Sequence, residues 1–358
     1  MDIQAKEYNL SKKRFVYLDE LRTLATVFVI AVHTVQLALT LMPEQSAMKY
    51  AYNIFNYVFL SCNLLFIMIS GALLLPVKGE SWKQFYQKRF LKVVVPLIIY
   101  YLLYVVAKEG VIWLYPNYWL SLLSRILSGA PSEAPHFWLI YVIIWLYVFT
   151  PFLRIAIQHL SNTMLDGLVI LILAFQILVT YLDVFYSNPI VLCIYKSYVG
   201  VFILGYYLSI ENRSSIKYVI YGTGILSICL AAYKILNGIA IDRYIFNNAP
   251  LTVFYVMALF LLFRQIYSKA VGEDSFTKII SKYSFGIMLI HWGVLHFVVK
   301  QKLHISPISF GTIGGSLLMI ILTLLFSLIG AFILDQTLIH WCLSFFSFIN
   351  RKITNSSE

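Results

Sequence analysis

Three ionisable side chains near the N-terminus have the spacing of a functional stripe along one helix. Asp19, Arg22 and His33 fall in the apolar segment 16–42, where ionisable groups are costly and are therefore functional candidates. At about 100° and about 1.5 Å per residue, a helix returns His33 to within about 20° of Arg22, roughly 16 Å further along. A cation at the cytoplasmic mouth and an imidazole near mid-membrane suit an anionic donor that enters from the cytosol. The alternative is structural: Arg22 extends to lipid headgroups beside Asp19, and His33 makes an interhelical hydrogen bond.

Two further histidines occupy comparable places. His291 follows Ser281 by ten residues on a segment that enters from the cytoplasm, so the helical rise places it about 15 Å deep, at the depth expected for His33. His136 begins an apolar segment at the outer face, beside Trp138. The alternatives are a packing hydrogen bond for His291 and an interfacial aromatic belt around Trp138. No chemistry is assigned to the histidines in loops or near helix ends, which are His159, His296, His304 and His340.

A basic cluster precedes the third apolar segment. Its members are Lys83, Lys88, Arg89 and Lys92. Ammonium and guanidinium groups bind phosphate through charge-assisted hydrogen bonds, so this cluster is a candidate site for a phosphorylated ligand. The alternative is the basic flank that anchors a membrane span on the cytoplasmic side.

The elements that must position these residues are membrane-spanning helices. Of the 358 residues, 60% are hydrophobic and only 12% are charged, whereas soluble domains have roughly 25% charged residues. This composition excludes an ordinary cytosolic enzyme. Apolar stretches close to the roughly 20 residues that cross a bilayer predict an all-α, polytopic transmembrane bundle of about ten helices. They lie near 16–42, 51–76, 90–107, 135–154, 165–182, 190–210, 216–237, 250–268, 281–300 and 309–334.

The bundle is expected to form one integral domain, 16–335. A cytoplasmic N-terminal segment, 1–15, precedes it, and an amphipathic or polar cytoplasmic tail, 336–358, follows it. The stretches 111–128 and 341–348 are amphipathic, so we expect them at a membrane interface rather than across the membrane.

The distribution of Lys and Arg predicts the orientation of the bundle. Alternate connecting segments hold 19 of the 27 Lys and Arg residues on one side and 8 on the other. The positive-inside rule then places both termini in the cytoplasm of a cell-membrane protein with ten spans. The formal net charge of +11 reflects this topology and not nucleic-acid binding, because the cations lie in connecting segments rather than along one soluble face.

The cysteines suggest neither a disulfide framework nor a metal site. The four are Cys62, Cys193, Cys229 and Cys342. Each is isolated in an apolar segment without the paired spacing of a zinc or redox motif, so we expect a packing role and no bound metal.

The segment Tyr17–Ala25, followed by His33, resembles the signature of acyltransferase family 3, in which ten residues separate Arg and His. Other segments are similar to further motifs of this family. They are Lys88–Pro96 at the basic start of the third helix, His136–Tyr141 with Tyr147 and Pro151 on the fourth, and Ser281–His291 on the penultimate helix. The resemblance extends from about 15 to 335. It departs at Thr23, where the family has Gly, and at Lys92, where it has an Arg whose bidentate geometry Lys cannot reproduce.

The resemblance implies an acyltransferase that moves an acyl group, commonly acetyl from acetyl-CoA, to a hydroxyl of a cell-surface glycan or of its lipid-linked precursor. It implies that His33 and Arg22 are catalytic. We expect Asp19, His291 and His136 to support them, His291 because of its depth and His136 because of its place at the outer face. The resemblance also implies that acyl-CoA is bound by Arg22, Lys88, Arg89 and Lys92. His33 is the expected general base, because histidine titrates near neutral pH. Asp19 is too far along the helix to orient His33, so we expect its partner to come from another helix.

A transporter or flippase of a lipid-linked polysaccharide is the alternative class, because many helices and intramembrane charges suit it equally. The sequence lacks the paired, interrupted half-helices that mark many secondary transporters, which counts against this alternative. A membrane scaffold without catalysis would leave Arg22 and His33 unexplained.

Overall fold

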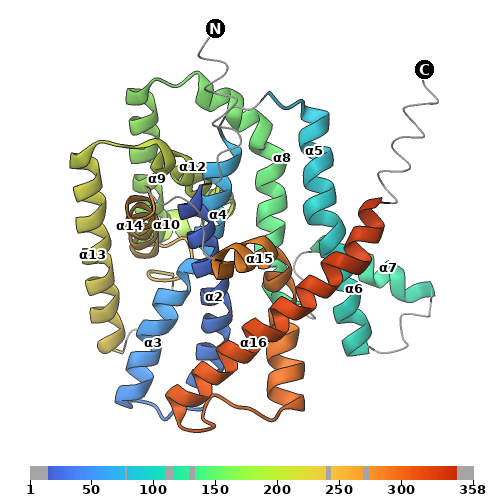
Figure 1. Cartoon of the computed structure of the whole chain (residues 1–358). Helices are drawn as coiled ribbons and strands as arrows, with labels where there is room; N and C mark the ends of the chain where they lie inside the picture. The colour runs from blue at the N-terminus through green and yellow to red at the C-terminus, as the bar shows by residue number, and fades with distance from the viewer. Residues whose placement is uncertain are drawn as a thin grey trace, which may run out of the picture. The chain divides into compact units, whose positions relative to one another are not determined.

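The structure is a computed structural model that describes residues 15–76, 79–109, 116–128, 134–238, 243–268 and 275–344. Every regular element in these ranges is a helix (Figure 1). Nine helical stretches of the described chain are long and apolar enough to cross a membrane. The predicted all-α, polytopic class is therefore confirmed.

The nine stretches follow the predicted order along the chain. They are α2 (Val16–Leu39); α3 and α4 (Ala47–Phe59, Ser61–Leu74); α5, η1 and α6 (Trp82–Arg89, Phe90–Val94, Val95–Glu109); η3 and α8 (Pro135–Phe137, Trp138–Gln158); α9 (Asn162–Tyr181); α11 and α12 (Pro189–Lys196, Val199–Ile210); α13 (Ser214–Leu236); α15 and η4 (Ser275–Gly293, Val294–Lys302); and α16 and η5 (Thr312–Leu334, Asp335–Ile339). A short helix, α10 (Asp183–Tyr186), lies between α9 and α11.

Serine side chains mark where several of these helices begin. Ser46, Ser81 and Ser161 each accept a hydrogen bond from the backbone N–H three residues later, at the starts of α3, α5 and α9. Such caps satisfy N–H groups that have no partner within the helix. The sequence therefore specifies these boundaries through local chemistry as well as through hydropathy.

The remaining predicted span, 250–268, corresponds to α14 (Pro250–Ile266), a shorter apolar helix of 17 residues. A helix of this length extends about 26 Å, slightly less than the roughly 30 Å hydrocarbon core. Figure 1 views α14 almost along its axis, whereas α13 is seen lengthwise, so these two contacting helices cross steeply. The tenth predicted crossing is therefore α14.

We predict ten crossings, so that alkaline phosphatase fused after Glu358 is inactive because it stays in the cytoplasm. If α14 did not cross the membrane, the Lys and Arg residues from Arg264 to Lys282 would all lie on the outer side of the membrane. That arrangement would contradict the positive-inside rule. Fusion after Asn237, at the end of α13, is the control and should be active. High activity after Glu358 would show an odd number of crossings.

A further short helix, besides α10 and α14, lies outside the nine stretches. α7 (Pro116–Ser128) covers part of the predicted interfacial segment 111–128 and is not a candidate span. Its Leu120 is 73% exposed while Leu122 is buried, which is the amphipathic pattern expected of an interfacial helix. Residues 110–115 and the tail beyond 344 lie outside the described residues.

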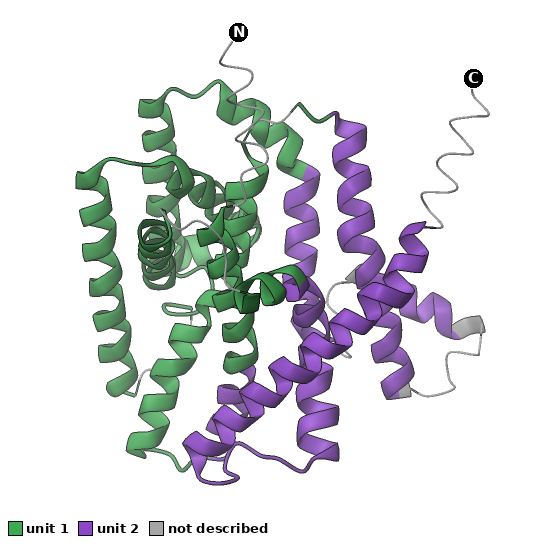
Figure 2. Ribbon diagram, viewed as in Figure 1, with its two compact units in different colours: residues 1–32, 42–80, 149–282 green, residues 33–41, 81–148, 283–358 purple. Residues whose placement is uncertain are grey.

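The chain divides into two compact units (Figure 2). The first comprises residues 1–32, 42–80 and 149–282, and the second comprises residues 33–41, 81–148 and 283–358. The predicted domain 16–335 thus contains parts of both, and α2, α8 and α15 each contribute residues to both.

In the first unit, α4 and α12 pack backbone against backbone. A Cβ added at Gly71 would lie 1.8 Å from the carbonyl oxygen of Phe202, and one added at Gly205 would lie 2.0 Å from that of Met68. Small residues permit such close approach between membrane helices, whose association depends on van der Waals packing.

Gly71→Ala should therefore destabilise the protein by about 1–3 kcal/mol or more, because the added methyl group meets a backbone atom that cannot rotate away. Thermal unfolding in detergent would measure the loss as a lower Tm. Gly222→Ala on α13 is the matched control, since nothing lies within 4 Å of a Cβ added there. A Gly71→Ala variant as stable as wild type would contradict the close approach.

In the second unit, a buried apolar cluster joins η4 to α16. It consists of Val294, Leu295, Val299 and Met319. Leu37 of α2 and Ile290 of α15 pack against it. This packing holds the end of α2 and the end of α15, the two segments that carry His33 and His291.

Candidate active site

Three histidines and a tryptophan meet in the second unit. The ring centroids of His33 and His291 are 5.3 Å apart, and those of His136 and His291 are 5.0 Å apart. The ring centroid of Trp292 lies 4.9 Å from that of His33 and 6.0 Å from that of His136. We call these four residues the histidine cluster. The structure thus brings together all three histidines that the sequence suggested for a site.

Three elements supply the cluster. His33 lies on α2, His136 on the η3 turn ahead of α8, and His291 and Trp292 at the end of α15. His291 and His136 are both buried. His296, in η4, places its ring centroid 4.2 Å from that of Trp292, so a histidine without assigned chemistry borders the cluster.

Tyr104 of α6 holds the end of α15. The N–H of Gly293 donates to Tyr104 Oη at 2.8 Å, and the tyrosine hydroxyl lies 3.1 Å from the carbonyl oxygen of Leu289 and 3.3 Å from that of Ile290. The π-helical segment η4 begins at the next residue, and such segments are frequent at functional sites. Nothing in the sequence distinguishes Tyr104 among 26 tyrosines.

Backbone carbonyl groups of α15 fix the tautomers of two histidines. His291 Nδ1 lies 2.7 Å from the carbonyl oxygen of Met288, and His136 Nε2 lies 3.0 Å from that of Leu289. A carbonyl oxygen only accepts, so each of these nitrogens carries a proton and donates it. In the neutral ring the other nitrogen then has a lone pair. These acceptors, His291 Nε2 and His136 Nδ1, are buried and have no hydrogen-bond partner among the described residues.

His33 contributes a third such nitrogen. Its Nδ1 is buried and, within the described ranges, has no hydrogen-bond partner. We expected its partner to come from another helix. α15 supplies ring contacts to His33 from His291 and Trp292.

Arg22 belongs to a network in the first unit. Its Nη1 lies 2.8 Å from Asp19 Oδ1 and 3.0 Å from Ser281 Oγ, and the Ser281 hydroxyl donates to Asp19 Oδ1. The side chains of Arg22 and Asp19 are 24% and 7% exposed, so this ion pair is largely buried. Arg22 and His33 both lie on α2, which is continuous between them. α15 contacts both residues: Ser281 contacts Arg22, and His291 contacts His33.

The basic cluster of α5 and η1 contains exposed and half-buried members. The exposed ones are Lys83, Lys88 and Lys92. The Cζ of half-buried Arg89 lies 5.2 Å from the ring centroid of Phe85 and 5.7 Å from that of Tyr147. Its Nε is buried without a hydrogen-bond partner in the described part of the chain. Cation–π contacts therefore orient Arg89, whereas Lys83, Lys88 and Lys92 are exposed at the surface.

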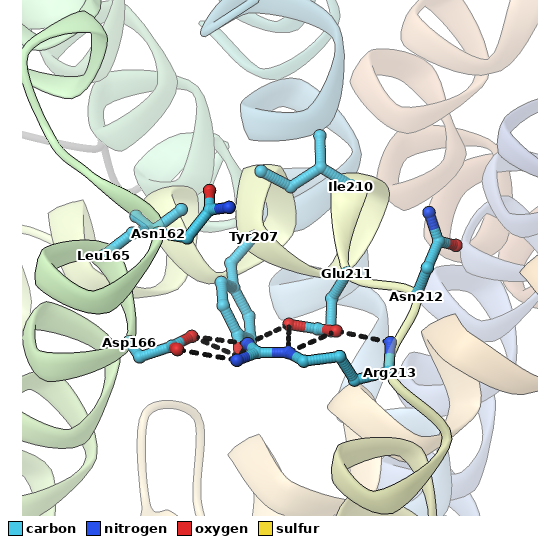
Figure 3. A pocket seen from close by; sticks show the side chains of 8 residues that line it. All are labelled: Asn162, Leu165, Asp166, Tyr207, Ile210, Glu211, Asn212 and Arg213. Atoms are coloured by element: carbon cyan, nitrogen blue, oxygen red, sulfur yellow. Dashed lines mark hydrogen bonds and ion pairs between the residues drawn. The ribbon is translucent and has the colours of Figure 1, made fainter.

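A pocket of about 410 Å³ in the first unit was not anticipated from the sequence (Figure 3). At its wall Arg213 binds Asp166 in bidentate fashion, at 2.6 and 2.8 Å, and also binds Glu211. The hydrogen bonds from Arg213 lower the pKa of Glu211 to about 2. Asp166 is an ionisable residue inside an apolar segment, so the criterion that identified Arg22 would also have found it. Because these charges pair with one another, the network ties α9 to the connection between α12 and α13.

Metal ligands do not gather in the described part of the chain, where no three His, Cys, Asp or Glu side chains are arranged to hold an ion. The cysteines are free; Cys62 is buried, and Cys193 and Cys229 are exposed.

Comparison with protein-family models matches residues 15–335 to the acyltransferase domain of family 3. The matched region contains the histidine cluster, the Arg22 network and the basic cluster. Comparisons with curated proteins and with solved structures find no match.

Proposed function

The chain belongs to acyltransferase family 3 and is a membrane acyltransferase, and we propose that it transfers acetyl from acetyl-CoA on the cytoplasmic side to a hydroxyl of a cell-surface glycan or its lipid-linked precursor. The observation that carries this proposal is the histidine cluster. Three imidazoles each hold a buried ring nitrogen without a described partner, on helices apolar enough to cross a membrane. Such nitrogens are suited to accept hydrogen bonds and protons from hydroxyl groups.

We assign the general base to His33. The pKa of a hydroxyl group lies far above 7, so its proton must be accepted as the oxygen attacks the thioester carbonyl carbon. In the net reaction, the acceptor O–H and thioester C–S bonds break, and an ester C–O bond and a thiol S–H bond form. His33 carries the proton from the hydroxyl group to the leaving sulfur.

The donor phosphates are assigned to Lys88, Arg89 and Lys92, with Arg22 as a further cation on the helix that carries His33. Arg89 supports this assignment because two aromatic rings orient its guanidinium and its Nε has no described partner. Lys92 supplies a point charge where the family motif has Arg. Asp19 supports the site by holding Arg22.

Neutralising two exposed lysines, as Lys88→Gln with Lys92→Gln, should raise the KM for acyl-CoA more than tenfold and change kcat little. Charge-assisted hydrogen bonds contribute about 1.5–3 kcal/mol each. These contacts are remote from the reacting carbonyl, so ground and transition states lose them equally. Steady-state kinetics at varied acetyl-CoA would measure the change, and added salt should mimic it.

The control is Lys300→Gln with Lys302→Gln, which removes two exposed lysines from the predicted outer side of the same unit. Its KM for acyl-CoA should equal that of wild type. Equal donor affinity in the Lys88/Lys92 variant would assign the basic cluster to membrane topology alone.

The proposed function is tested with purified protein reconstituted in vesicles and given radiolabelled acetyl-CoA, with and without candidate glycans. Label transferred to a glycan only in the presence of active protein supports it. Movement of a lipid-linked glycan across the bilayer without any acyl transfer would favour the transporter alternative instead.

A further inference from the structure

In two rings of the histidine cluster, those of His136 and His291, backbone contacts determine which nitrogen carries the proton and which carries the lone pair. The N–H groups of His136 and His291 are already committed to carbonyl oxygens of Leu289 and Met288, at 3.0 and 2.7 Å. The lone pairs therefore remain on His136 Nδ1 and His291 Nε2. A buried acceptor without a donor is unfavourable, and here two such acceptors lie on rings whose centroids are 5.0 Å apart.

The groups around this pair do not supply the missing donors. The third histidine, His33, also has a buried nitrogen, Nδ1, without a described partner, and it donates to neither ring. The hydroxyl of Tyr104 lies against the carbonyl oxygens of Leu289 and Ile290 and accepts from Gly293. No described side chain or backbone group, the Trp292 N–H included, donates to His136 Nδ1 or His291 Nε2. A bound molecule can supply the donors, and neutral hydroxyl groups satisfy buried acceptors without bringing a charge into an apolar site.

We infer that His136 and His291 determine acceptor specificity by accepting hydrogen bonds from hydroxyl groups next to the one that is acylated. The site then takes a vicinal polyol, with the reacting hydroxyl at His33 and its neighbours at the other two rings. An alcohol with a single hydroxyl group leaves both acceptors without a donor while it reacts. This inference rests on the proposed function for the role of His33.

Nitrogen NMR of the full-length protein tests the inference without acyl transfer. The protein, labelled with ¹⁵N-histidine, is reconstituted in bilayers, and the ring signals are assigned with His136→Asn and His291→Asn. The probes are octane-1,2,3-triol, octane-1,8-diol and octan-1-ol, which share one carbon chain. The vicinal triol should shift both lone-pair nitrogens saturably, and the other two probes should not shift both. Absence of that shift, or an equal effect of all three probes, would overturn the inference.

Kinetics provide the second measurement once a glycan is acylated. His291→Ala and His136→Ala should each raise the acceptor KM by about tenfold, while the KM for acetyl-CoA stays unchanged. His291→Asn, which retains an acceptor oxygen, should recover part of the loss. A glycan analogue lacking the neighbouring hydroxyl should be acylated equally by wild type and His291→Ala. A further loss in the variant would overturn the inference.

The two proposals fail separately. Shifts that depend on the vicinal triol, without acyl transfer, would contradict the proposed function and retain the binding pair. Acyl transfer with no such shift would retain the function and exclude the pair.

Discussion

His33→Ala is expected to lower acyl transfer by about 10²- to 10⁴-fold, which removes detectable product, because it removes the general base. The variant should still be expressed and inserted, since replacing a polar residue with Ala makes a membrane span easier to insert. The contacts that the substitution removes are those of the His33 ring with His291 and Trp292. Label transferred from acetyl-CoA to the acceptor measures the effect.

Two variants control for this result. His159→Ala removes an exposed histidine at the end of α8 and should be as active as wild type. His33→Gln keeps a polar side chain, but the Gln amide cannot accept a proton near neutral pH. This variant should therefore also be inactive. Wild-type amounts of product from His33→Ala would exclude His33 as the base.

Arg22→Ala is expected to abolish acyl transfer as well, and Arg22→Lys should restore it only in part, because Lys cannot reproduce the two-pronged geometry of a guanidinium group. The structure adds a second possible cause of inactivity. Asp19 is largely buried against Arg22, and removing one partner of a buried ion pair typically destabilises a protein by about 3–5 kcal/mol. Loss of activity alone therefore does not assign Arg22 to the donor.

The double variant Asp19→Asn with Arg22→Ala separates the two causes. It removes the carboxylate charge that Arg22→Ala leaves behind, so its Tm should recover relative to the single variant. If Arg22 binds the donor, the double variant stays inactive although it is stable. If acyl transfer and Tm both recover in the double variant, the role of Arg22 is only to neutralise the buried carboxylate of Asp19.

The helices were largely predictable from the sequence, because a run of apolar residues must become a hydrogen-bonded helix in a bilayer. The seventh span, expected at 216–237, is α13 at Ser214–Leu236. The third was expected at 90–107, yet the helical stretch begins at Trp82. Hydropathy does not detect its first turns, because the polar and cationic residues of α5 continue the helix without continuing the apolar run.

The sequence predicted a common depth for His33 and His291, since the helical rise per residue is nearly constant. The structure adds that their rings are in contact, with centroids 5.3 Å apart. The network of Arg213 could have been found in part, because Asp166 interrupts an apolar run. Its partners Glu211 and Tyr207 carry no comparable signal, as they lie at the end of another helix.

Only the tertiary structure decides what the histidines can do. His136 meets the carbonyl oxygen of Leu289 across 153 positions of sequence, and that contact leaves its Nδ1 as the acceptor. Arg89 is distinguished from its neighbouring lysines only by the rings of Phe85 and Tyr147. The physical reason is the same in both cases. Hydropathy and helical rise specify each helix and the depth of its residues, whereas the rotation of one helix against the next depends on close contacts between side chains and backbone, which no local pattern records.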